Sequence, residues 1–119
     1  MAIRKVLCVD DAQTDLTNIE KIVSGAGLLV TTATNGKDAL AKAKNDKPDL
    51  IFLDVNMPEM DGFAMLRELK KDADMKSIPV VLVTSKNQKA DKMWAQVQGA
   101  NGYVTKPYTP EQILEQINR

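Results

Sequence analysis

Short apolar runs alternate with longer amphipathic stretches along the whole chain. The runs are rich in valine, leucine and isoleucine and predict strands at residues 5–9, 28–33, 49–54, 78–84 and 102–104. In most of them the apolar residues stand at consecutive positions, which is typical of parallel strands covered on both faces. Apolar residues at helical spacing follow each run and predict a helix after every strand. The pattern therefore predicts a three-layer α/β fold with a five-stranded parallel sheet and right-handed crossovers.

Polar residues and glycines mark where these helices begin and end. Asn35 is a suitable N-cap for the second helix, whose apolar face carries Ala39, Leu40 and Ala43. Residues 109–112 read Thr-Pro-Glu-Gln, which predicts a capping box with proline in the first turn of the last helix. Glycines at the far ends of the first and fourth helices favour termination there.

Length and charge exclude several classes of protein. The 119 residues predict one domain, residues 1–119, with no output domain, since a domain usually takes roughly 100–200 residues. Sixteen basic residues balance sixteen acidic ones, so no net charge draws the chain to nucleic acid or to an anionic membrane. Because the sequence has neither a signal peptide nor a run long enough to span a membrane, we expect a cytoplasmic protein.

The residue types that are missing narrow the chemistry further. The chain has no histidine, which excludes histidine-ligated metal sites and a histidine general base. A single cysteine, Cys8, excludes an internal disulfide, and its place within an apolar strand predicts a buried thiol.

Polar residues follow the predicted strands at the point where each strand ends. Asp10 and Asp11 follow the first strand, Asp54 closes the third, Thr84 closes the fourth and Lys106 follows the fifth. Because the carboxyl ends of parallel strands share one edge of the sheet, we expect these side chains to gather there. Isolated acidic residues at such positions are often only solvated loop residues. The presence of three carboxylates, a hydroxyl and an ammonium together at strand ends favours a binding site.

Clustered carboxylates repel one another, so some of them must be protonated, pair with a cation or bind a metal ion. Oxygen ligands without histidine or cysteine favour a hard divalent ion, Mg²⁺ or Mn²⁺. Such a site can receive a phosphoryl group, with Lys106 and the Thr84 hydroxyl bound to its oxygens and one carboxylate acting as the nucleophile.

Four segments carry a resemblance to a known family. They are Val9-Asp10-Asp11 and residues 53–62, 79–85 and 99–108. In order and spacing they resemble the receiver domains of two-component response regulators, the CheY-like family. The resemblance implies a doubly wound (βα)5 flavodoxin-like fold with strand order 2-1-3-4-5.

The resemblance also assigns roles. Asp54 would be the phosphoacceptor, and Asp10, Asp11, Asp54 and the backbone carbonyl of Asn56 would hold Mg²⁺. The remaining residues would act on the phosphorylated site: Lys106 would pair with the phosphoryl group and precede a cis peptide bond to Pro107, while Thr84 and Tyr103 would form a switch.

These roles imply a stand-alone response regulator rather than an enzyme with an external substrate. A sensor histidine kinase, with a CheA-like kinase as one candidate, would phosphorylate Asp54. The fourth helix, fifth strand and fifth helix would then bind a downstream protein, with the chain a monomer or a phosphorylation-dependent dimer. Residues 91–94 (Asp-Lys-Met-Trp) and 98–100 (Gln-Gly-Ala) resemble the PilH-type receivers of chemotaxis-like systems that control type IV pilus twitching.

Three alternatives stay open from the sequence. The chain could be a receiver excised from a larger regulator with a DNA-binding or enzymatic output domain. An aspartyl-phosphate phosphatase is less favoured, because Asn56 stands where such enzymes place a second aspartate as acid and base. A binding module that works without phosphorylation is also less favoured, because it would not explain the acidic cluster.

Overall fold

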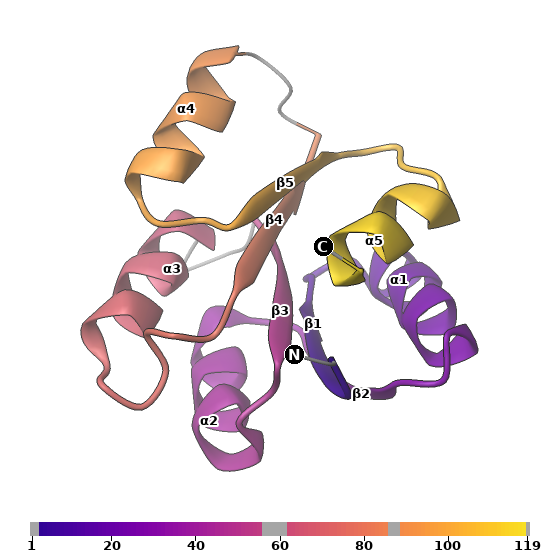
Figure 1. Ribbon diagram of the computed structural model, residues 1–119, viewed down its shortest axis with the longest axis horizontal. Helices are drawn as coiled ribbons and strands as arrows, with labels where there is room; N and C mark the ends of the chain where they lie inside the picture. The colour runs from indigo at the N-terminus through magenta and orange to yellow at the C-terminus, as the bar shows by residue number, and fades with distance from the viewer. Residues whose placement is uncertain (1–2, 56–61, 86–88, 119) are drawn as a thin grey trace.

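Strands and helices alternate along the chain (Figure 1). The computed structural model describes residues 3–55, 62–85 and 89–118. The strands are β1 (Lys5–Val9), β2 (Leu29–Ala33), β3 (Leu50–Asp54), β4 (Val80–Thr84) and β5 (Gly102–Thr105). The helices are α1 (Gln13–Gly25), α2 (Gly36–Asp46), α3 (Gly62–Lys71), α4 (Lys89–Val97) and α5 (Pro110–Ile117). Each strand lies within two residues of its predicted bounds.

The strands form one parallel sheet in the order β2-β1-β3-β4-β5. This confirms the three-layer α/β fold and the strand order that the resemblance implied. After β1 the chain crosses to β2 at one edge, and after β2 it returns to β3 on the other side of β1. The order of the strands reverses there, which is where such folds bind ligands.

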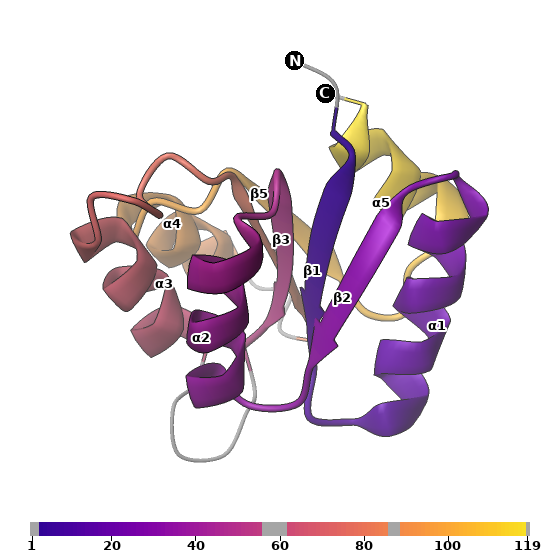
Figure 2. The same ribbon diagram turned by 90° about the horizontal axis from the view of Figure 1, so that it is seen from below.

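Helices cover both faces of the sheet (Figure 2): α1 and α5 lie on one side, and α2, α3 and α4 on the other. Successive residues of a strand point to opposite faces, so each strand contributes to two cores. In β1, Val6 and Cys8 pack with residues of α1 and α5, whereas Leu7 and Val9 pack with residues of α2, α3 and α4. The consecutive apolar residues of the sequence are thus explained by burial on both sides.

Position in the sheet decides how much of each strand is buried. The two strands on either side of the crossover point, β1 and β3, and their neighbour β4 are almost wholly buried, while the edge strand β2 exposes Leu29. None of the helices in the described part of the chain is long and apolar enough to cross a membrane.

The predicted helix starts are confirmed. The Asn35 side chain accepts a hydrogen bond of 2.7 Å from the backbone N–H of Asp38, and Thr109 and Gln112 form the capping box. The spacing of apolar residues correctly predicts a helix at α4. It does not predict which face of that helix is buried. Met93, Trp94 and Val97 are exposed by half or more, and among the side chains of α4 that the structure describes, Ala95 is buried in the core.

The reactivity of the buried Cys8 thiol tests how tightly the sheet and helix α1 pack around it. Burial, aided by the negative charge of Glu20, raises the pKa of Cys8 to about 12. At pH 8 about one thiol in ten thousand is therefore ionised, and the thiolate is the reactive form. We expect no reaction of the native protein with a disulfide reagent over minutes at pH 8. After unfolding in guanidinium the thiol should react at once, and fast reaction of the native protein would contradict this packing.

Candidate functional site

The structure brings the predicted polar residues to one edge of the sheet. Asp54 and Thr84 are the last residues of β3 and β4, and Asp10 and Lys106 directly follow β1 and β5. These four strands are neighbours, so residues from distant parts of the sequence meet across the crossover point. Asp10, Asp54 and Thr84 are the buried polar residues of the described chain.

Three carboxylates form a cluster at this edge. Asp10, Asp11 and Asp54 each place a carboxylate oxygen within 4.8 Å of the others. Asp10 and Asp54 are buried, whereas Asp11 is exposed on the solvent side. An all-oxygen donor set at this spacing, open on one side, fits a hard divalent cation such as Mg²⁺.

The Lys106 ammonium lies against this cluster. Its Nζ donates a hydrogen bond of 2.8 Å to Asp10 Oδ2 and lies 3.7 Å from Asp54 Oδ1. Burial by itself would lower the pKa of Lys106. The hydrogen bonds to Asp10 and Asp15 and the charge of Asp54 outweigh burial and raise this pKa above its ordinary value. Lys106 is therefore a permanent cation beside the acidic cluster.

Asp15 is a member of this site that the sequence analysis missed. It lies in the first turn of α1, and its Oδ2 accepts a hydrogen bond of 3.0 Å from Lys106 Nζ. An acidic residue in the first turn of a helix is common for electrostatic reasons alone. The sequence therefore carries no signal that distinguishes Asp15 from a residue that only stabilises its own helix.

The backbone around Asp10 and Lys106 holds their side chains in place. Asp10 Oδ1 accepts a hydrogen bond of 2.9 Å from the N–H of Ala12, where the chain turns into α1. The N–H of Lys106 donates a hydrogen bond of 2.8 Å to the carbonyl of Thr84. The peptide bond between Lys106 and Pro107 is cis, as the resemblance implied.

Thr84 and Tyr103 lie on the other side of the sheet from α1. Thr84 is fully buried, and Tyr103 is partly buried against the core formed with α2, α3 and α4. Burial and the negative charge of Asp91 raise the pKa of Tyr103. The two residues are on adjacent strands, with Tyr103 opposite Leu82 in the register. Asn56, the remaining predicted ligand, lies outside the described residues.

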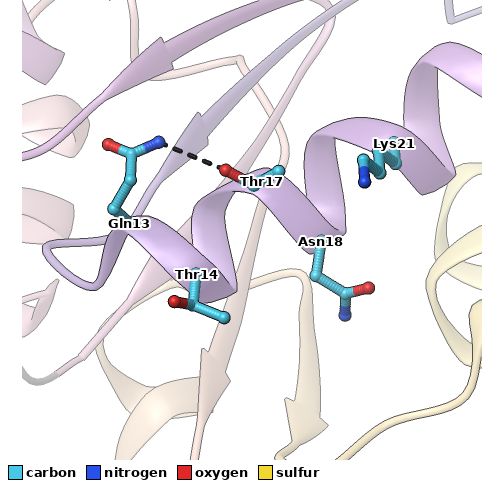
Figure 3. A pocket seen from close by; sticks show the side chains of 5 residues that line it. All are labelled: Gln13, Thr14, Thr17, Asn18 and Lys21. Atoms are coloured by element: carbon cyan, nitrogen blue, oxygen red, sulfur yellow. Dashed lines mark hydrogen bonds between the residues drawn. The ribbon is translucent and has the colours of Figure 1, made fainter.

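A separate hollow of about 410 Å³ lies along the exposed face of α1 (Figure 3). It is lined by polar residues of that helix: Gln13, Thr14, Thr17, Asn18 and Lys21. Gln13 donates a hydrogen bond of 3.2 Å to Thr17, one turn further along. Asp10, Asp11 and Asp54 do not line this hollow.

Comparisons with known proteins agree with this geometry. Residues 6–118 match the response regulator receiver domain family. The chain belongs to that family. It is 41% identical to the protein PilH of Pseudomonas aeruginosa over 96% of this chain and 94% of PilH. The chemotaxis protein CheY4 of Vibrio cholerae has the same fold, with a TM-score of 0.92, 35% identity and coverage of 99% of this chain and 98% of that one.

The same receiver domain also occurs in longer relatives. The chain is 36% identical to the transcriptional regulatory protein PhoP of Bacillus subtilis over 96% of its own length. It spans 47% of PhoP.

A glycine sets how closely α3 approaches the acidic cluster of this receiver domain. Gly62 opens α3, and its N–H donates a hydrogen bond of 2.9 Å to the carbonyl of Val55. A Cβ atom on Gly62 would lie 2.6 Å from the carbonyl oxygen of Asp54 and 2.7 Å from the Cα of Val55. Both are backbone atoms, so any side chain at this position must push the end of β3 and the start of α3 apart.

We therefore expect Gly62→Ala to damage the site as well as the fold. Overpacking of this kind costs about 1–3 kcal/mol of the free energy of unfolding. The displaced Asp54 carboxylate should also weaken Mg²⁺ binding, measured by titration calorimetry beside urea unfolding.

Gly25→Ala is the matched control for this change. Gly25 ends α1, and a Cβ there meets no atom within 4 Å. This substitution should leave both measurements close to those of the original protein. A Gly62→Ala protein with unchanged stability and Mg²⁺ affinity would contradict the close approach.

Proposed function

We propose that this receiver domain is a switch that accepts a phosphoryl group on Asp54 from a sensor histidine kinase. The observation that supports it best is the meeting of a buried carboxylate, Asp54, with the buried Asp10 and the Lys106 ammonium. Lys106 lies 3.7 Å from Asp54 Oδ1, close enough to reach oxygens attached to that carboxylate. A buried carboxylate beside a cation, facing further carboxylates, is suited to phosphoryl transfer.

The transfer replaces one bond to phosphorus with another. A carboxylate oxygen of Asp54 attacks the phosphorus of a phosphohistidine, the P–N bond breaks with its electrons returning to the imidazole, and an acyl phosphate forms. Water later cleaves the new O–P bond, which restores Asp54 and releases phosphate. The domain catalyses its own phosphorylation and slow dephosphorylation and turns over no external substrate.

Asp10, Asp11 and Asp54 would hold Mg²⁺ during this transfer, with the backbone carbonyl of Asn56 as a further ligand. When bound, the ion supplies positive charge to the phosphoryl oxygens. Lys106 neutralises part of the remaining charge and orients the group. Thr84, buried at the end of β4, would donate its hydroxyl to a phosphoryl oxygen.

We further propose that α4, β5 and α5 carry the signal to a downstream protein. Thr84 and Tyr103 link the site to this surface, because Tyr103 lies on β5 and lines a hollow of about 210 Å³ with residues of α4. Three exposed apolar residues of α4 support a role in contact: Met93, Trp94 and Val97. Scattered apolar residues are normal on a surface, but a group of them on one helix favours an interaction site.

The similarity to PilH and CheY4 supports a cytoplasmic role in chemotaxis or in type IV pilus motility. A CheA-like kinase would then be the phosphoryl donor. The match to part of PhoP supports a second candidate, in which this receiver controls an output domain in a longer protein.

Trp94 offers a built-in reporter of the switch. Its ring lies edge-on to Phe63, with the ring centroids 6.5 Å apart. Phe63 follows Gly62, which abuts the Asp54 backbone, so a change at Asp54 has a short route to the indole. With Mg²⁺ present, we expect beryllofluoride, which stands in for a phosphoryl group on a carboxylate, to change the Trp94 fluorescence.

The same addition should leave the fluorescence of Asp54→Asn unchanged, and incubation with acetyl phosphate should add one phosphoryl group to the mass of the original protein only. A response that persists in Asp54→Asn would place the acceptor elsewhere. A protein with neither response nor added mass would instead be a binding module that works without phosphorylation.

A further inference from the structure

Lys106 is held by a carboxylate outside the acidic cluster. Asp15 lies on α1 rather than at a strand end, and its Oδ2 is 3.0 Å from Lys106 Nζ. The corresponding distance to Asp54 Oδ1 is 3.7 Å. The ammonium therefore makes its hydrogen bonds to Asp10 and Asp15, and lies further from the carboxylate that it is proposed to serve.

We propose that Asp15 is a positioning residue that draws the Lys106 ammonium toward α1 and releases it when Asp54 is phosphorylated. This inference rests on the function proposed above. It adds a residue that sets how readily the phosphorylated state forms.

The two ion pairs of Lys106, with Asp10 and with Asp15, differ in how easily they break. The Asp10 side chain is 7% exposed and also accepts the Ala12 N–H, so its carboxylate depends on Lys106 for charge balance. The Asp15 side chain is 48% exposed. Water can replace Lys106 at Asp15 at low cost, whereas a buried carboxylate that loses its cation is strongly destabilised. Asp15 is therefore the partner that Lys106 gives up.

Phosphorylation supplies the competing attraction. A phosphoryl group adds close to two negative charges and three strong acceptor oxygens. Placed on Asp54, it would lie within reach of Lys106 and draw the ammonium away from Asp15. Because Lys106 Nζ lies 3.0 Å from Asp15 Oδ2 and 3.7 Å from Asp54 Oδ1, its movement toward a phosphoryl group on Asp54 weakens the Asp15 ion pair. This ion pair therefore stabilises the unphosphorylated state relative to the phosphorylated one.

The surroundings leave room for the exchange. A hollow of about 370 Å³ opens beside the ion pair, between α1 and the segment that joins β5 to α5. Its lining consists of Asp15, Asn18, Ser85, Lys106, Pro107 and Tyr108. The Asp15 and Lys106 side chains therefore both border open space.

The test is the affinity of the Mg²⁺-loaded protein for beryllofluoride. Fluorine NMR measures this affinity through the signal of the bound species. Asp15→Asn removes the charge and keeps the shape. We expect its half-saturating beryllofluoride concentration to fall about two- to fivefold, the range for a partly exposed ion pair. Asp15→Glu keeps the charge and should remain near the original value. Without Mg²⁺ or beryllofluoride, the side-chain nitrogen signal of Lys106 should shift in Asp15→Asn.

Asp38→Asn is the matched control. Asp38 also lies in the first turn of its helix, has a side chain 42% exposed, and pairs with a lysine at 3.1 Å. The Asp38→Asn substitution removes the same charge at a comparable position away from the site. The beryllofluoride affinity and the Lys106 nitrogen signal should therefore stay as in the original protein.

Each contrary outcome has a separate meaning. Unchanged or weaker beryllofluoride binding in Asp15→Asn, or an unmoved Lys106 signal, would overturn the role of Asp15. An equal gain in Asp38→Asn would reduce the effect to net charge and overturn it as well. If the original protein binds no beryllofluoride, the proposed function fails, and the inference that rests on it fails with it.

Discussion

Repulsion among carboxylates is the constraint on which this site depends. Asp10, Asp11 and Asp54 share a few ångströms, and two of them are buried. Positive charge stabilises such a cluster, and Lys106 supplies it from the end of β5. Because Lys106 provides only one positive charge for three carboxylates, the site remains suited to bind a metal ion.

The two faces of the sheet carry different parts of the site. Its α1 and α5 face carries the side chains around Lys106, including Asp15, and the opposite face carries Tyr103 and the helices α3 and α4. Thr84 and Asp54 end adjacent strands at the edge between the faces. The phosphorylation proposed for Asp54 would therefore act at the edge that both faces share.

Much of the fold could be predicted because its signals are local. Consecutive apolar residues in a strand report burial on both faces, and Asn35 and Thr109 report helix starts through their own side chains. The strand-end residues Asp10, Asp54, Thr84 and Lys106 could be grouped as well, since parallel strands place their carboxyl ends together. The strand order could not be obtained this way and entered only through the resemblance to a family.

The sequence by itself determined the α/β class, the positions of the strands and helices, and the residue types at the strand ends, because these follow from periodicity and composition. Only the tertiary structure decided that Asp15 shares Lys106, that Gly62 touches the Asp54 backbone, and that α4 buries Ala95 while exposing Trp94. These features depend on how helices far apart in the chain pack on the sheet. Local patterns carry no information on such distances, so packing alone could reveal them.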